Sequence, residues 1–176
     1  MPFESACNRV ASKGLRMGTK TSIAALLHEL DDRSPSGCAI ALHITFTAPK
    51  FMIQTYAKPW LDFYNSKGLL LNDPVVRWGF QNNGFVRWSE LEAIDPDGVL
   101  EHAKDFGLMN GVAISVVSTK SRSISGFARA DRDYTDSEIG ALTELLGRLH
   151  FETEGMDPDN AADAQALADL SIRLTH

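Results

Sequence analysis

Two pairs of apolar segments with alternating side chains limit this chain to a mixed fold built on antiparallel strands. The first pair, residues 38–47 and 51–56, is joined by a short turn that contains Pro49. The second pair is residues 112–118 and 123–130. Each pair is predicted to be a β-hairpin. Because side chains alternate between the two faces of a strand, the first strand should place four apolar residues on one face: Ile40, Leu42, Ile44 and Phe46.

Helices are predicted at both ends of this region. One apolar stripe at helical spacing follows Ser22, a good N-cap, and consists of Ile23, Leu26, Leu27 and Leu30. A longer stripe follows a capping box of Thr135 and Glu138, and consists of Ile139, Leu142, Leu145, Leu146 and Leu149. Residues 85–88 should add a short central strand. Since a sheet must cover its apolar faces, we expect an α+β fold, a three-layer α-β-α sandwich around a five-stranded antiparallel sheet.

Shorter helices are predicted between the two hairpins. The first begins near Pro59 and ends at Gly68, because proline suits a first helical turn and glycine a C-terminus. The second begins at Asp73, and the third lies within residues 97–106. These helices would form one layer over the sheet.

Composition excludes several classes of protein. The chain has 176 residues, 44% of them hydrophobic, which suits one globular domain. Its net charge is −6 and its basic residues are scattered, which argues against nucleic-acid binding by this segment. No stretch approaches the roughly 20 apolar residues that cross a bilayer, and the N-terminus lacks the apolar run of a secretory signal. Cys7 and Cys38 are too few for a disulfide framework. We therefore expect a cytoplasmic protein that does not bind membranes.

No sequence pattern of a common enzyme is present. There is no Gly-x-Ser-x-Gly elbow, no HExxH and no glycine-rich phosphate loop. The five histidines are dispersed, at positions 28, 43, 102, 150 and 176, and form no metal-ligand motif. We expect neither catalysis nor a metal or cofactor.

Aromatic residues and one carboxylate have a spacing that indicates a pocket. Trp60 and Tyr64 lie four residues apart and share one helical face, with Tyr56 just before them. Asp73 and Trp88 follow. Taken singly, each has an ordinary structural explanation: the aromatic rings would be core residues and Asp73 an N-cap before a favoured N1 proline. The two roles of Asp73 are compatible, because one carboxylate oxygen can cap while the other meets a ligand.

In order and spacing, these residues resemble the autoinducer-binding domain of LuxR-type quorum-sensing regulators. The resemblance spans about residues 20–155. It also includes Pro74-Val75, Ala103, Gly107, Gly111 and Gly126. It implies that an N-acyl-homoserine lactone is enclosed between the sheet and one helical layer.

The resemblance also implies a role for each site residue. Asp73 would accept the amide N–H of the lactone, Trp60 would donate to the lactone carbonyl, and Tyr56 would approach the amide carbonyl. Tyr64 and Trp88 would wall the head group and the start of the acyl chain. The room for the ligand would be set in part by Ala103, Phe106 and Leu108.

Two positions depart from the family pattern. Val75 stands where many members carry threonine or serine, which removes a hydroxyl. Arg129 stands where serine or threonine often bonds the head group, and an unpaired guanidinium in a pocket for a neutral ligand would be costly. We expect Arg129 to face solvent, toward Asp131 or Asp133, with Ser125 as the substitute donor. If Arg129 faces the cavity instead, a ligand with an extra oxygen or a carboxylate is favoured.

The expected domain organisation has three parts. Residues 1–20 form a lead-in, residues 21–154 the autoinducer-binding domain, and residues 155–176 a linker. In this family a helix-turn-helix DNA-binding domain follows the linker and opens with a segment like Leu174-Thr175-His176, so DNA would be reached only through a domain outside this chain. The chain would be either part of a longer regulator or a naturally shortened protein, and a homodimer is expected.

Two other functions remain open from the sequence. One is a sensor of similar architecture for another small molecule, such as a nucleotide or an aromatic acid. The other is a dimerisation module whose aromatic residues are core, without a ligand-sized cavity.

Overall fold

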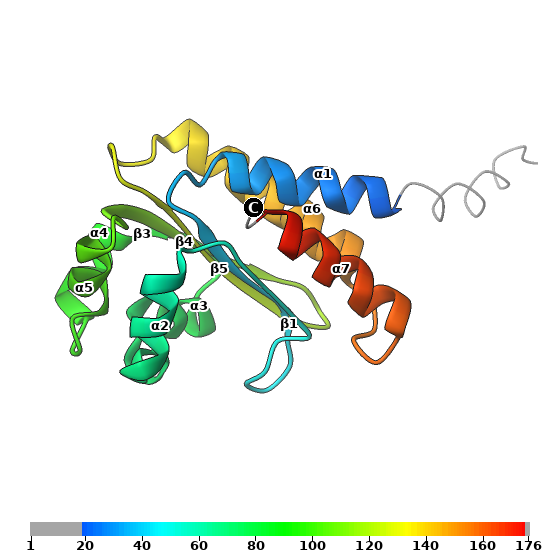
Figure 1. Cartoon of the computed structure of the whole chain (residues 1–176), viewed down its shortest axis with the longest axis horizontal. Coiled ribbons are helices and arrows are strands. Elements are labelled where there is room, and N and C mark those ends of the chain that lie inside the picture. Colours follow the sequence, from blue (N-terminus) through cyan, green and yellow to red (C-terminus); the bar gives the residue numbers. More distant parts are fainter. Residues whose placement is uncertain (1–18, 175–176) are drawn as a thin grey trace, which may run out of the picture.

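The structure is a computed structural model that describes residues 19–174, and an antiparallel sheet runs through its centre (Figure 1). All neighbouring strands are antiparallel, in the order β2-β1-β5-β4-β3. Their bounds are β1 Cys38–Ile44, β2 Phe51–Gln54, β3 Gly84–Arg87, β4 Asn110–Val117 and β5 Arg122–Arg129. The predicted hairpins are β1–β2 and β4–β5, and β5 pairs with β1 to join them. The prediction of a five-stranded antiparallel sheet is confirmed.

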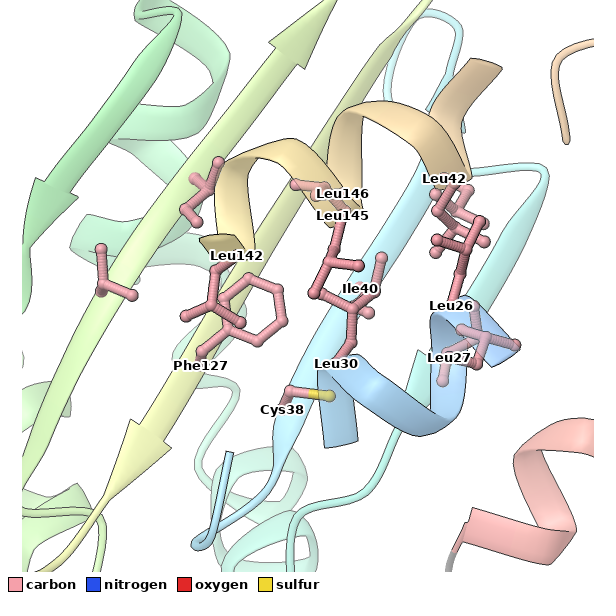
Figure 2. Packing of buried hydrophobic residues seen from close by; sticks show 14 of the residues in the cluster. Leu26, Leu27, Leu30, Cys38, Ile40, Leu42, Phe127, Leu142, Leu145 and Leu146 are labelled. Atoms are coloured by element: carbon pink, nitrogen blue, oxygen red, sulfur yellow. The ribbon is translucent and has the colours of Figure 1, made fainter. Parts of the chain in front are cut away.

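One face of the sheet is covered by helices from the two ends of the chain (Figure 1). These are α1 Thr19–Asp32, α6 Asp136–Thr153 and α7 Ala161–Leu174. Figure 2 shows apolar side chains of α1 and α6 packed against those of β1 and β5, with Leu30 near Ile40 and Leu142 beside Phe127. The predicted capping box starts α6: Glu138 N–H donates to Thr135 Oγ1 at 3.2 Å, and Thr135 N–H donates to Glu138 Oε2 at 2.8 Å. The predicted apolar stripe of α6 is buried.

The other face is covered by the short elements between the hairpins (Figure 1). They are α2 Lys58–Ser66, the 3-10 turn η1 Leu69–Asn72, α3 Pro74–Gln81, α4 Trp88–Leu91, the 3-10 turn η2 Glu92–Ile94 and α5 Val99–Asp105. Pro59 lies in the first turn of α2, and Gly68, with a φ of 61°, follows its end. Asp95 caps α5 by accepting from Val99 N–H and Leu100 N–H, both at 2.8 Å. The three-layer sandwich is therefore as predicted.

The two faces of the sheet differ in side-chain size. On β1, the large residues Ile40 and Leu42 face α1 and α6, whereas the intervening Ala39 and Ala41 face the other layer. The central strands β4 and β5 repeat this pattern, with small residues on the same side: Gly111, Ala113, Gly126 and Ala128. A floor of small side chains leaves space between the sheet and the helices that cover it.

Several predicted details are wrong. Helix α1 already includes Thr19, the first described residue, so Ser22 lies inside the helix and is not its N-cap. Phe46 does not share the buried face of β1 and is 98% exposed. The strand ends at Ile44, next to His43 and Phe46, whose φ values of 57° and 62° interrupt the alternation.

The third strand also differs from its prediction. Strand β3 lies at the edge of the sheet, not in the centre, and pairs only with β4. Trp88 is the first residue of α4 and is not part of the strand. Edge and central strands have similar local sequence patterns. The position of a strand in the sheet is therefore known only from its pairing with the other strands.

The segment expected to be a linker is largely helical. Helix α7 packs back on the domain, and its Leu167 is buried in the cluster that also contains α1 and α6 side chains. Residues 1–18 and 175–176, including Cys7, lie outside the described residues. Cys38 is a buried thiol, and burial raises its pKa to about 12. No helix within residues 19–174 is long and apolar enough to cross a membrane.

Candidate ligand-binding site

A cavity of about 360 Å³ lies between the floor of small side chains and the helical layer of α2, η1, α3 and α5. Its volume is within the range of small-molecule sites, about 300 to 1,000 Å³. Most of its wall is apolar, and the polar groups gather where α2 meets the start of α3. All five residues of the predicted site line it: Tyr56, Trp60, Tyr64, Asp73 and Trp88.

Among the described residues, Asp73 supplies the only carboxylate in the wall of this cavity. Its Oδ1 accepts from Val75 N–H at 2.8 Å, which caps α3, and its Oδ2 accepts from the Tyr64 hydroxyl at 2.7 Å. The residue is 8% exposed. Burial raises the pKa of this carboxyl, although the bonds from Tyr64 and from the backbone lower it in part. Because a carboxylate has about four acceptor positions, Asp73 can accept a further donor from the cavity.

Tyr56 and Trp60 form the wall next to Asp73. Tyr56 follows β2, and its hydroxyl donates to the Gly126 carbonyl at 3.1 Å. Trp60 lies on α2 with its ring 5.5 Å from those of Tyr64 and Phe106, measured between centroids. Such pairs hold an aromatic side chain in one orientation. The rings of this wall are therefore positioned before any ligand arrives.

Trp88 packs flat against the sheet at a glycine. A Cβ built on Gly111 would lie 2.1 Å from Trp88 Cδ2, so no larger residue fits there. On the neighbouring strand β5, a Cβ on Gly126 would lie 3.5 Å from Trp88 Cζ2 and 3.1 Å from the Tyr56 hydroxyl. These two glycines let the aromatic wall approach the strands closely.

The indole N–H of Trp88 is also unusual. It is one of three buried side-chain polar atoms without a hydrogen-bond partner among the described residues, the others being Arg33 Nε and His150 Nε2. A buried donor of this kind is costly unless it is satisfied by a water or a ligand.

The less central predicted residues divide into two groups. Val75 and Ala103 line the cavity. Phe106 and Leu108 do not: Phe106 packs behind Trp60, and Leu108 is buried in the same apolar cluster. Phe106 therefore acts on the cavity only through the position of Trp60.

Ser125 borders the cavity but is not a free donor. Its hydroxyl donates to the Ile114 carbonyl of the neighbouring strand at 3.1 Å. Because Gly126 presents its Cα to Tyr56 and Trp88, the side chain of Ser125 points to the opposite face of β5. The prediction that Ser125 serves as the substitute donor is wrong.

Arg129 does not reach the cavity. Its guanidinium pairs with Asp131 at 2.8 Å and Glu138 at 3.2 Å and lies over the Tyr134 ring. Asp133 pairs with Arg87 instead, at 3.2 Å. The expected direction, toward Asp131 or Asp133, is confirmed, with Asp131 as the partner. With 11% of its side chain exposed, Arg129 is also more enclosed than expected.

Many residues of the wall were not predicted. They come from the floor, the first hairpin and the helices: Ala39, Ala41, Ile44, Thr47, Pro49, Met52, Gln54, Leu61, Asn65, Leu70, Val76, Phe80, Val99, Leu100 and Ile124. One signal for them exists in the sequence, because Ala39 and Ala41 alternate with the much larger Ile40 and Leu42. Small residues on one face of a strand are what a cavity floor requires. No group of three metal-binding side chains occurs among residues 19–174.

An α-β-α sandwich with a largely apolar cavity and a few convergent polar groups defines a small-molecule-binding sensor domain. The chain belongs to the autoinducer-binding domain family, whose model matches residues 38–152. The resemblance found in the sequence is thereby confirmed, and with it the ligand-sensing role of this domain type in LuxR-type quorum-sensing regulators.

Known relatives agree with this assignment. The transcriptional activator protein LuxR of Aliivibrio fischeri is 28% identical over 92 residues, which cover 49% of this chain and 37% of that protein. SdiA in complex with octanoyl-rac-glycerol has a similar fold, with a TM-score of 0.56 and 19% identity over 92% of this chain and 64% of that one. The N-acylhomoserine lactone dependent factor CepR2 of Burkholderia cenocepacia has a TM-score of 0.53 and 14% identity over 78% of this chain and 95% of that one.

Proposed function

We propose that this domain binds an N-acyl-homoserine lactone in the cavity and is stabilised by it. The observation that carries the proposal is the buried carboxylate of Asp73, held by Tyr64 next to Trp60 at the polar end of an otherwise apolar cavity. An amide N–H is the kind of neutral donor that such a carboxylate accepts, and the bond is stronger than one between neutral partners.

The other polar groups at this end match the rest of the head group. The indole N–H of Trp60 would donate to the lactone carbonyl. The Tyr56 hydroxyl, which donates to the Gly126 carbonyl in the structure, would rotate to donate to the amide carbonyl of the ligand. Tyr64 and Trp88 enclose the ring and the first carbons of the chain, with Val75 and Ala103 beside them. The acyl chain then lies on the apolar part of the wall.

Two other observations support a neutral, acylated ligand. SdiA, which has a similar fold, forms a complex with octanoyl-rac-glycerol, a neutral molecule with an acyl chain. Arg129 is paired with acidic residues outside the cavity, which removes the main argument for a ligand with a carboxylate or phosphate. A dimerisation module without a cavity does not account for 360 Å³ of space beside Asp73.

The proposal is tested by the thermal midpoint of the domain with and without acyl-homoserine lactones of several chain lengths. Ligand at about 100 times its dissociation constant adds roughly 2.7 kcal/mol of stability. For a domain of this size that raises the midpoint by several degrees. Mass spectrometry first establishes that the protein is ligand-free. A ligand-free protein with an unchanged midpoint for every lactone would favour a sensor for a different small molecule.

The activity of the whole protein is a further part of the proposal. We infer that ligand binding favours a homodimer and that the signal reaches DNA through a separate DNA-binding domain, with residues 155–176 leading toward it. The relationship to LuxR, which is named a transcriptional activator, supports this, and a cytoplasmic location suits such a role. We propose binding, with no catalytic step.

A further inference from the structure

The cavity has a side that opens to solvent, and apolar residues form its edge. Met52, Leu70 and Phe80 line the cavity, yet they are 47%, 57% and 40% exposed. We call these three residues the rim. Exposed apolar side chains are common singly, but these three all line the same cavity and are also in contact with solvent.

The opening has a clear structural origin. Strand β2 is an edge strand, and its residues alternate between the α1–α6–α7 layer and the cavity. Phe51 and Ile53 are buried on the first side, whereas Met52 and Gln54 face the cavity and are exposed. Among residues 19–174 no strand lies beyond β2 in the sheet, so the outer edge of β2 is not paired with another strand.

The opposite end of the cavity is closed. Trp60, Asp73 and Trp88 are only 5%, 8% and 7% exposed. Asp73 and the two indole groups therefore lie at the enclosed end, whereas the rim lies at the open end, where the exposed polar residues Thr47, Gln54 and Asn65 also line the cavity. A ligand with a polar head and an alkyl tail fits this polarity in one direction only, with its head deep in the cavity and its tail toward the rim.

We propose that the acyl tail of the ligand leaves the cavity across the rim. Because no wall closes the cavity there, the domain accepts acyl chains that are longer than the cavity. This inference rests on the proposed lactone function. Each methylene buried within the cavity should raise affinity about fourfold. Methylenes that cross the rim lie against Met52, Leu70 and Phe80 and still add affinity, whereas methylenes beyond the rim lie in water, add little and meet no obstruction.

The first test is the dissociation constant of each unsubstituted lactone from butanoyl to hexadecanoyl, below the critical micelle concentration of each. We expect affinity to rise with chain length and then to stay level. A tenfold or larger loss for the longest chains would show a closed cavity and overturn the inference, while leaving the proposed function intact. Absence of binding by every lactone would overturn the proposed function and this inference with it.

The second test uses two neighbouring leucines of η1. Leu70 lines the cavity, whereas Leu71 is 84% exposed and does not, so Leu70→Gln and Leu71→Gln are a matched pair. Leu70→Gln should weaken binding of dodecanoyl and longer lactones several-fold and leave butanoyl binding unchanged. Leu71→Gln should change neither. Equal effects of the two variants, or an equal loss for short and long chains in Leu70→Gln, would show that the tail does not cross the rim.

Discussion

The Tyr64 hydroxyl donates to Oδ2 of Asp73 at 2.7 Å while Oδ1 of the same carboxylate caps α3. Asp73 thus joins two helices, since Tyr64 lies on α2. Asp73 therefore caps α3 and also lines the cavity, so the two expected roles are compatible in geometry. The cap fixes the carboxylate, and the fixed carboxylate faces the cavity.

Replacement of Asp73 by asparagine should separate these two roles. Asparagine caps helices about as well as aspartate, so we expect Asp73→Asn to change the free energy of unfolding by less than about 1 kcal/mol. Lactone binding should weaken about 10- to 100-fold, because the side-chain amide places a donor opposite the ligand N–H. Calorimetric titration and urea unfolding measure the two effects. An equal loss of binding and stability would leave only the capping role.

Lactone affinity should increase as the pH rises. Burial raises the pKa of Asp73 in the free domain. A ligand N–H favours the carboxylate and lowers that pKa, so binding releases a proton while Asp73 is protonated in the free state. Once the pH exceeds the raised pKa, the dependence should disappear.

Tyr64→Phe provides the matched test of this pH effect. The Tyr64 hydrogen bond lowers the pKa of Asp73, so its removal should move the rise in affinity to higher pH. Titration in buffers of different ionisation enthalpy measures the released proton. A dissociation constant that is independent of pH in both proteins would contradict the proposed contact.

Gly111→Ala should be destabilising and should disturb the site. The added Cβ would lie 2.1 Å from Trp88 Cδ2, so the ring must move. Overpacking of this kind costs about 1 to 3 kcal/mol, and a displaced Trp88 should also lower lactone affinity. The tryptophan near-UV circular dichroism and thermal unfolding measure these changes.

Gly140→Ala is the control for that substitution. Gly140 is exposed within α6, and a Cβ there has nothing within 4 Å. Alanine in a helix interior is more stable than glycine by up to about 1 kcal/mol, so this variant should gain stability and keep full binding. If Gly111→Ala behaved in the same way, the close approach of Trp88 to β4 would be wrong.

A buried histidine pair should make the domain less stable in acid. The His43 ring bonds the Ser121 and Thr153 hydroxyls at 2.8 and 2.7 Å and lies 4.6 Å from the His150 ring, between centroids. Burial, then the nearby His150 and Lys50, lower the pKa of His43 to about 4, against an opposing effect of Glu154. Burial also lowers the pKa of His150.

The sign of the effect follows from proton binding. Between pH 6.5 and about 4 the unfolded chain binds more protons at His43 than the folded domain. Stability is therefore complete above pH 6.5 and falls as the pH drops through this interval, by at most on the order of 3 kcal/mol from His43. His43→Asn, which tolerates the positive φ, should flatten the profile measured by urea unfolding. The same substitution at exposed His28 should leave it unchanged, and a profile unaffected by His43→Asn would contradict this role.

The local features of the sequence determined the elements of the fold. Three of these features depend on neighbours a few residues away, and each appears as expected. They are the capping box of Thr135 and Glu138, the first helical turn at Pro59, and the alternation of Ile40 and Leu42. The order of Trp60, Tyr64 and Asp73 likewise sufficed to predict the family and the polar end of the site.

Tertiary structure alone decided which way the side chains of the sheet face and where space remains. A strand shifted by one residue reverses its two faces, so the pairing of β5 with β1 and β4 decides that Gly126 faces the site while Ser125 and Arg129 do not. The edge position of β3 and the open side at β2 are likewise properties of strand order. The cavity exists because small residues from three strands meet beneath aromatic rings from separate helices, a coincidence of distant segments that no local pattern encodes.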